Sequence, residues 1–273
     1  MSKIAILAGK GHLPSVFAER AVARGYHVVA IHLLGETDPQ LAQIAHASHT
    51  VHIGQWQRII DLLKQENIQD VYLSGGVSKG LLFSNAQFDA RVMGLVAGLR
   101  EKNDDAIIKA FVHDLAQEGI TVRPQTDLVA DVHLQPGILT NMELNDEAWS
   151  DIRFGFRTAK ALAGLDIGQT VVVKNGAVLA VEAIDGTDAT ISRGGRLARG
   201  GGVAVKVAKP DQDMRFDVPT IGLDTLETAI ASGLQAIALE AGKTIIVDEK
   251  AVIERANEAG LNLVLVQPEM CTV

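Results

Sequence analysis

Cysteines and long apolar runs are what the sequence has least of. Among its 273 residues the only cysteine is Cys271, so neither a disulfide within one chain nor a cysteine metal cluster can form. No apolar run approaches the roughly 18 residues of a membrane-spanning helix. The start, MSKIAILAGKGHLP, is too short in apolar residues for a secretory signal and is typical of a first strand. We expect a cytoplasmic protein, with peripheral contact at a membrane surface left open.

An excess of basic residues is also missing. Lys and Arg number 25 against 33 Asp and Glu, which gives a formal net charge of −8 at pH 7. A general nucleic-acid binder needs a basic face to neutralise phosphates, so we expect no nucleic-acid partner. A small phosphorylated ligand needs only a local cationic pocket and stays open. The composition, with 47% hydrophobic residues, is ordinary for a globular protein, and the chain is long enough for two domains.

Strand-like and helix-like patterns alternate through the first half of the chain. KIAILA (3–8) is a continuous apolar run, as expected for a strand covered on both faces. Repeated βα units with short loops predict a Rossmann-like parallel sheet, which we assign to a nucleotide-binding domain of residues 1–130. The expected strands are 3–8, 27–33, 50–53 and 70–76, and the expected helices are 14–25, 55–68, 88–100 and 104–117.

The stretch 122–146, with two prolines and mixed polarity, interrupts this alternation, and within it we place a linker at 131–145. Residues 146–273 predict a separate α/β domain. Its clearest element is a hairpin over 170–183, because Asn175-Gly176 suits a tight two-residue turn. Further strands are expected at 203–208, 236–239, 244–247 and 262–266, and helices at 146–163 (capped by Asn145 or Asp146), 224–232 and 248–258.

Two glycine-rich loops follow strands of the first domain. AGKGHLP (8–14) links the first strand to the first helix, where the backbone can approach a phosphate. The dinucleotide fingerprint needs a third glycine where Pro14 stands, and an acid after the second strand, where none precedes Glu36. An NAD site is therefore disfavoured, whereas a nucleotide or phosphosugar is not. The candidate ligand contacts in this loop are Gly9, Gly11, His12 and Leu13.

The second glycine-rich loop, SGGVSKG (74–80), follows the fourth strand. Open α/β sheets bind ligands at the carboxyl ends of their strands, and two such loops on one edge favour a cleft. Its candidate contacts are Gly75, Gly76 and Val77, with Lys79 nearby. Asp104, at the head of the next helix, is either a plain helix cap or a ligand contact.

Charged residues gather in two stretches of the second domain. KVAKPDQDMRFDVPTIG (206–222) carries three aspartates among three cationic residues, and its two prolines exclude a regular helix. VEAIDGTDATISRGG (181–195) has more carboxylates than one helix cap needs: Glu182, Asp185 and Asp188. Carboxylates with lysines and arginines suit Mg²⁺ and phosphate, the parts of a pyrophosphate-cleaving enzyme. The alternatives are a solvated loop with self-paired charges and a simple capping turn.

Together these motifs resemble the LpxI family, the UDP-2,3-diacylglucosamine pyrophosphatases of lipid A biosynthesis. The resemblance runs from the first strand to the last and rests on AGKGHLP, SGGVSKG, NDDA (103–106), LDIGQTVVVKNGAVLAVEAIDGTDA (165–189) and KPDQDMRFDVPTIG (209–222). It implies a nucleotide-binding Rossmann-like domain, a family-specific catalytic domain and a homodimer. It also implies Mg²⁺-dependent hydrolysis of UDP-2,3-diacylglucosamine to UMP and 2,3-diacylglucosamine 1-phosphate (lipid X).

The resemblance also assigns roles. The family's essential aspartate carries over to Asp217, which would act on Mg²⁺ or on the attacking water. Asp213 and Asp188 are the next candidates, with Asp188 joining Asp217 as metal ligand. Phosphate oxygens would be held by Lys209 and Arg215, with Thr187 as a hydrogen-bond donor. Uridine would lie near the glycines of the first domain.

Two other functions remain as alternatives. A nucleotide-sugar sensor would keep the glycine loops but would leave its ligand intact. An NAD(P)-dependent oxidoreductase would need the missing acid after the second strand.

Overall fold

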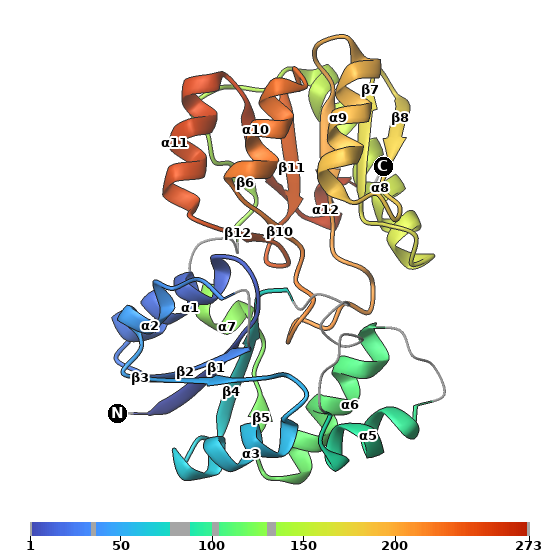
Figure 1. Ribbon diagram of the computed structural model, residues 1–273. Helices are drawn as coiled ribbons and strands as arrows, with labels where there is room; N and C mark the ends of the chain where they lie inside the picture. The colour runs from blue at the N-terminus through green and yellow to red at the C-terminus, as the bar shows by residue number, and fades with distance from the viewer. Residues whose placement is uncertain (1, 34–36, 77–87, 100–103, 130–134, 272–273) are drawn as a thin grey trace. The chain divides into compact units, whose positions relative to one another are not determined.

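In a computed structural model the chain forms two compact units, Met1–Leu128 and Val129–Val273 (Figure 1). The structure describes residues 2–33, 37–76, 88–99, 104–129 and 135–271. Each unit has its own sheet and its own helices, and each is described by itself below.

The first unit contains a five-stranded sheet in the order β3-β2-β1-β4-β5, with every neighbouring pair parallel. This confirms the expected Rossmann-like sheet. The third strand begins earlier than expected, at Ala47, because the chain from there pairs with β2. The strands are β1 (Lys3–Ala8), β2 (His27–Leu33), β3 (Ala47–Val51), β4 (Asp70–Ser74) and β5 (Thr121–Val122).

Helix α1 of the first unit begins and ends at residue types that favour helix termini. Pro14 lies in the first turn of α1, and Gly25, with φ 81°, follows the helix end. Helix α3 buries Ile59, Ile60 and Leu63, which share one face of the helix. The described helices are α1 (Leu13–Ala23), α2 (Leu41–Ile44), α3 (Trp56–Gln65), α5 (Ala90–Ala97), α6 (Asp104–Gln117) and α7 (Thr126–Val129).

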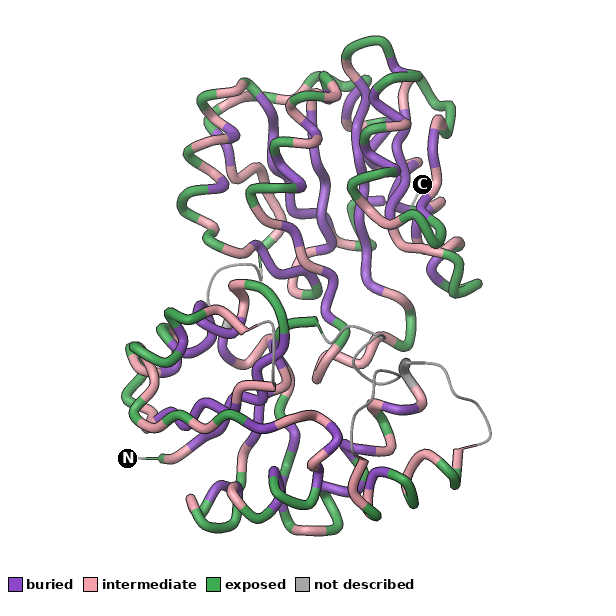
Figure 2. Tube along the Cα trace, viewed as in Figure 1, coloured by how far each residue is buried: buried purple, intermediate pink, exposed green. Residues whose placement is uncertain are grey.

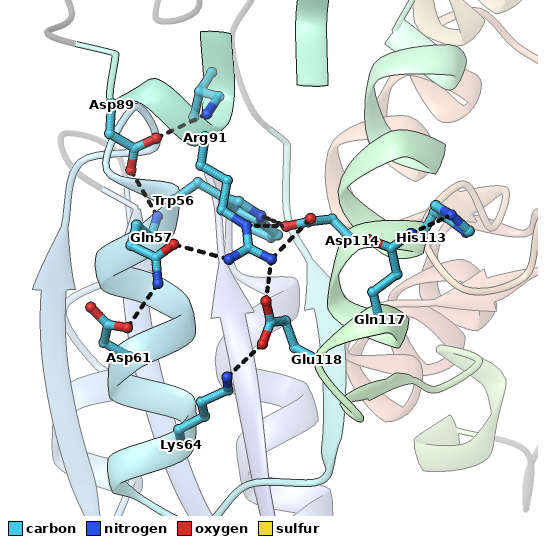
Figure 3. A network of polar contacts seen from close by, with 11 residues as sticks. Trp56, Gln57, Asp61, Lys64, Asp89, Arg91, His113, Asp114, Gln117 and Glu118 are labelled. Carbon is cyan, nitrogen blue, oxygen red and sulfur yellow. Dashed lines mark hydrogen bonds and ion pairs between the residues drawn. The ribbon is translucent and has the colours of Figure 1, made fainter. Parts of the chain in front are cut away.

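A polar network joins α3, α5 and α6 (Figure 3). The buried carboxylate of Asp114 accepts hydrogen bonds from the indole Nε1 of Trp56 at 2.8 Å and from Arg91 Nε at 2.8 Å and Nη2 at 3.0 Å. Arg91 also contacts Glu118, which accepts from Lys64. These acceptors raise the pKa of Arg91 above its ordinary value, Asp114 first among them. The network fixes three helices by charge as well as by packing.

The second unit contains a six-stranded mixed sheet in the order β6-β13-β11-β9-β7-β8. The central strands β9, β11 and β13 are parallel to one another, whereas β6 is antiparallel to β13 and β7 is antiparallel to both β8 and β9. Gly137 and Ile138, within the range expected as a linker, pair with β13 and extend this sheet. The strands are β6 (Gly137–Ile138), β7 (Thr170–Lys174), β8 (Ala177–Val181), β9 (Val203–Lys206), β11 (Ala236–Glu240) and β13 (Asn262–Val266).

The strand expected near 244–247 forms outside the six-stranded sheet. Two-residue β12 (Ile245–Ile246) pairs in parallel with β10 (Thr220–Ile221), which the sequence did not predict. This pairing fixes the position of the end of the charged stretch 206–222, just before α10.

Helices cover both faces of the second sheet, and its four central strands, β7, β9, β11 and β13, are buried almost throughout, whereas the edge strand β8 is largely exposed (Figure 2). Alternate residues of each strand face opposite sides: Val203 and Val205 pack with α8, whereas Ala204 packs with α9, α10 and α11. This double burial explains why the strands are continuous apolar runs. The helices are α8 (Asp146–Gly164), α9 (Thr187–Ala198), α10 (Leu223–Ala231), α11 (Glu249–Ala259) and α12 (Pro268–Cys271).

Two local features confirm expectations for the second unit. The hairpin β7–β8 turns at Asn175 and Gly176, with φ of 51° and 71°, and the backbone N–H groups of both donate to Asp151 at 2.8 and 2.7 Å. Helix α8 is capped by Asn145, whose side chain accepts from Ala148 N at 2.8 Å. Within the described ranges, no helix is both long and apolar enough to cross a membrane.

Candidate functional sites

The two glycine loops of the first unit meet at the carboxyl edge of its sheet. Lys10 N donates to Gly76 O at 2.6 Å, and Gly76 N donates to Lys10 O at 3.0 Å. A Cβ on Gly9 would lie 2.3 Å from Gly76 O, and one on Gly75 would lie 2.6 Å from Lys10 O. The loops therefore need glycine at both positions to approach each other.

Two other glycines of this edge have no close neighbour among the described residues. In the described part of the chain, no atom lies within 4 Å of a Cβ built on Gly11 or Gly76, and Gly11 has φ 95°. A ligand could approach the backbone there. The structure thus brings together most of the contacts expected in this unit: Gly9, Gly11, His12, Leu13, Gly75 and Gly76. Val77 and Lys79 lie outside the described residues, and Asp104 begins α6 with its side chain outside the description.

His12, at the start of α1, is held by a residue that the sequence did not predict for the site. Its Nδ1 lies 2.6 Å from Asp38 Oδ2, which also accepts from the buried Ser15 hydroxyl at 2.8 Å. Asp38 Oδ1 accepts from Gln40 N at 2.9 Å. Burial acts to raise the pKa of Asp38, but these hydrogen bonds outweigh it and lower the pKa. Asp38 lies after β2, in the region where an NAD site carries its ribose-binding acid. Both of its carboxylate oxygens, however, already make hydrogen bonds within the protein.

The second candidate site lies at the carboxyl edge of β9 in the second unit. Strand β8 is parallel to β9, since both are antiparallel to β7, so Glu182 after β8 emerges at the same edge as Lys206 at the end of β9. Helices α9 and α10 begin after the N-cap glycines Gly186 and Gly222, which have no side chain to accept from the first backbone N–H groups. Their N-terminal partial charges favour anions near this edge.

Lys206 is the buried cationic residue of this edge, with 7% of its surface exposed. Its Nζ donates to Thr187 Oγ1 and to the carbonyl oxygen of Thr220, both at 3.0 Å. Burial lowers the pKa of the Lys206 ammonium group. Three carboxylates oppose that shift and therefore lie within electrostatic reach: those of Glu182, Asp188 and Asp217.

The first turn of α9 is anchored by hydrogen bonds that use its expected site residues. Thr187 Oγ1 donates to Glu182 Oε1 at 2.8 Å, and Glu182 Oε2 accepts from Gln169 N at 3.1 Å. Asp188 Oδ1 accepts from Thr225 Oγ1 of α10 at 2.8 Å. A threonine hydroxyl has one proton, so in this arrangement Thr187 gives it to Glu182.

The stretch after β9 is an irregular loop up to β10, as its prolines predicted. Asp213 and Arg215 pair within it, with Arg215 Nε 2.8 Å from Oδ1 and Nη2 2.6 Å from Oδ2. Gln212 ties the loop together: its Oε1 accepts from Lys209 N at 2.9 Å, and its Nε2 donates to Asp217 Oδ2 at 2.6 Å. The self-paired charges foreseen as an alternative are therefore present within the loop.

Lys209 and Asp217 lie on the accessible side of this loop. Lys209 Nζ is 2.6 Å from Asp166 Oδ1 and 4.0 Å from Asp217 Oδ2, and the Asp217 side chain is 54% exposed. An exposed ion pair such as Lys209–Asp166 is weak and exchanges readily for another anion.

The donor chemistry at this edge fits Mg²⁺ bound together with a substrate. Among the described residues, no group of three or more His, Cys, Asp or Glu side chains could hold a metal ion alone. Mg²⁺ typically takes one or two carboxylates and fills its other positions with water and phosphate. Asp217 and Asp188 supply oxygens of that kind, and both lie near Lys206.

Three residues of these sites were not assigned roles from the sequence: Lys206, Gln212 and Asp38. Lys206 carried a signal, because it ends the apolar run Val-Ala-Val of a buried strand. Gln212 and Asp38 act through contacts that only the folded loops create.

Two family models match the chain. The model described as the LpxI N-terminal domain matches residues 3–132, and the one described as the LpxI C-terminal domain matches residues 135–264. A curated relative, the UDP-2,3-diacylglucosamine pyrophosphatase LpxI of Caulobacter vibrioides, is 34% identical over 280 residues, covering 98% of this chain and 99% of the relative.

Solved structures resemble the chain more distantly. A UDP-glucose-4-epimerase from Stenotrophomonas maltophila is 13% identical with a TM-score of 0.29, covering 44% of this chain and 35% of its own. The biotin carboxylase domain of the Hydrogenobacter thermophilus 2-oxoglutarate carboxylase is 16% identical with a TM-score of 0.30, covering 64% of this chain and 35% of its own. The chain spans about a third of the length of these structures.

Proposed function

Since the chain belongs to the LpxI family, as its motifs predicted, we propose that it hydrolyses the pyrophosphate bond of UDP-2,3-diacylglucosamine. The products are UMP and 2,3-diacylglucosamine 1-phosphate. The observation that carries the proposal is the similarity to a pyrophosphatase along nearly all of both chains. In the reaction a water oxygen bonds to one phosphorus, the bond from that phosphorus to the bridging oxygen breaks, and the released proton passes to a base or to solvent.

Asp217 is the proposed catalytic aspartate. Its carboxylate is exposed, lies beside Lys209, and is oriented by the Gln212 amide. An ionised carboxylate so placed can orient a water molecule and accept its proton. Mg²⁺, held by Asp217 and Asp188, would neutralise negative charge on the phosphates.

Lys209 and Arg215 are the proposed phosphate ligands. Lys209 can exchange the exposed Asp166 for a phosphate oxygen. Arg215 is held in place by both oxygens of Asp213, so Asp213 orients the guanidinium group. Asp213 therefore serves the reaction best as a partner of Arg215.

The first unit is the proposed nucleotide-binding unit. Its open glycines Gly11 and Gly76 admit a ligand to the backbone, and His12 at the start of α1 offers a hydrogen bond to a phosphate or ribose. Asp104 and Thr187 remain proposed contacts: Asp104 from the family pattern, and Thr187 through the hydrogen bonds that hold the first turn of α9.

We further propose a cytoplasmic homodimer that contacts the inner-membrane surface. The homodimer rests on family membership. For the membrane, three apolar side chains are exposed next to the candidate edge of the second unit: Leu165 and Ile167 before β7, and Ile184 after β8. Exposed apolar side chains suit acyl chains or a lipid surface. Flotation with vesicles of anionic phospholipid, compared between wild type and Ile184→Asp, tests the contact.

Product analysis tests the reaction itself. The purified protein is incubated with UDP-2,3-diacylglucosamine, with Mg²⁺ or with EDTA, and UMP and lipid X are measured by mass spectrometry. We expect both products in equal amounts with Mg²⁺ and little of either with EDTA. Binding of an intact substrate would instead identify a nucleotide-sugar sensor.

A further inference from the structure

Burying the ammonium group of Lys206 costs more free energy than burying an apolar side chain at the same position. It ends β9 after Val203, Ala204 and Val205, and only 7% of its surface is exposed. A buried ammonium group loses its hydration and is retained mainly where it is paired or functional. Titratable groups perturbed by burial and by specific charge partners gather at active sites.

The two hydrogen bonds of Lys206 connect two separate parts of the candidate site. Thr187, its first acceptor, directly precedes Asp188 in the first turn of α9. Thr220, its second acceptor, follows Asp217 by three residues and begins β10. One amine therefore holds the segments that carry both proposed metal-binding carboxylates.

The charges around Lys206 match this arrangement. Carboxylates close to one another repel, and Glu182, Asp188 and Asp217 all act on Lys206. A central ammonium group offsets that repulsion in a site where solvent screens little. The hydroxyl of Thr187 accepts from Lys206 and donates to Glu182, which extends the connection to the end of β8.

We propose that Lys206 is a positioning residue for pyrophosphate hydrolysis, holding the Thr187–Asp188 turn and the Asp217–Thr220 segment in their working arrangement. This inference rests on the proposed function. In the hydrogen bonds described, Lys206 contacts neither of the proposed phosphate ligands, Lys209 and Arg215, so its role is separate from theirs.

Lys206→Met is the first test, because methionine fills the same space without a charge. The substitution leaves the Thr220 carbonyl and the buried Glu182 carboxylate without this cation, so we expect a lower unfolding temperature than that of wild type, with the fold retained. We expect kcat to fall about 100-fold or more and KM to change less than about threefold, as when a preorganised electrostatic group is lost.

Lys174→Met is the matched control. Lys174 also ends a strand and also donates to two backbone or hydroxyl oxygens, here Ala198 O at 2.8 Å and Gly200 O at 2.6 Å. Because β7 is antiparallel to β9, its end lies at the opposite edge of the sheet. We expect this variant to lose stability and to keep kcat within about threefold of wild type.

Chemical rescue separates positioning from packing. Lys206→Ala leaves a space into which ethylammonium or propylammonium fits, and we expect these amines to restore kcat at least about tenfold, without effect on Lys174→Ala. The inference is overturned if Lys206→Met keeps wild-type kcat, if it fails to fold, or if no amine rescues Lys206→Ala. If the wild type is active, any of these three results overturns the role of Lys206 but leaves the proposed function unaffected. A wild type that releases no UMP overturns both the role of Lys206 and the proposed function.

Discussion

His12 and Asp38 form a pair at the glycine edge of the first unit, with Nδ1 of the imidazole 2.6 Å from Oδ2 of the carboxylate. The pair commits Nδ1 of His12 to the protein and fixes the orientation of the ring at the start of α1. Asp38 also receives the Ser15 hydroxyl and a backbone N–H, which fixes its own position.

Asp38→Asn should therefore weaken nucleotide binding. The amide removes the negative charge that orients the His12 ring, and loss of one charge-assisted contact corresponds to a Kd for UMP about tenfold higher. Titration calorimetry with UMP measures it. Glu66→Gln is the control, because it removes a carboxylate 3.1 Å from another histidine, His49. Equal weakening in both variants would contradict a specific role for His12.

Asp114→Ala should destabilise the first unit strongly. It leaves Arg91 and the Trp56 indole without their shared acceptor, and breaking a buried ion pair costs on the order of 3 kcal/mol. Urea unfolding of the whole chain measures the loss. Glu227→Ala, which removes the exposed partner of Arg255, should cost less than about 1 kcal/mol. Similar losses in the two variants would show that the network of Figure 3 contributes little.

Two helical glycines should respond oppositely to alanine. A Cβ on Gly194 in α9 would lie 2.4 Å from the Cβ of Val172, so Gly194→Ala forces the helix from the sheet and should cost about 1–3 kcal/mol. Gly94 in α5 has no neighbour within 4 Å of that position among the described residues, so Gly94→Ala should stabilise by about 0.5–1 kcal/mol. Thermal unfolding of both variants gives the sign, and a stabilising Gly194→Ala would contradict the close packing of α9.

Glu118 should contribute to stability in a pH-dependent way. Hydrogen bonds from Lys64 and Arg91 lower its pKa to about 2. A carboxyl group with a lowered folded pKa contributes fully above its unfolded value, about 4.3, and loses that contribution as the pH falls toward the folded value. The unfolding temperature of wild type should exceed that of Glu118→Gln at about pH 6 and approach it near pH 2. A gap that stays constant with pH would contradict this.

Much of the fold could be predicted because its signals are local. Apolar runs marked most of the longer strands of both sheets, and Asn175-Gly176 marked the hairpin, but two-residue β5 was not predicted. Elements made by pairing rather than by pattern were missed: two-residue β6 and β10 exist because β13 and β12 pair with them. The early start of β3 has the same cause, since β2 supplies its partner.

The sequence predicted which residues form the candidate sites better than it predicted which side chains they bond to. Glycines and aspartates in the right loops identified the two edges, but their hydrogen bonds depend on side chains far apart in sequence. His12 finds Asp38 across 26 positions, and Lys206 finds Thr187 across 19. The pairing of Arg215 with its near neighbour Asp213 was foreseen only as one alternative, a loop with self-paired charges, because the sequence does not show which charges meet.

Cleavage of UDP-2,3-diacylglucosamine by wild type and by Asp217→Asn decides whether the loop after β9 carries out hydrolysis. Asparagine keeps the shape of the side chain, and its amide oxygen can still accept from Gln212 Nε2, but it cannot take a proton from water. With Mg²⁺ present, UMP release should fall about 1000-fold or more in the variant, while the Kd for the substrate stays within about threefold. Equal release of UMP by both proteins would contradict the role of Asp217.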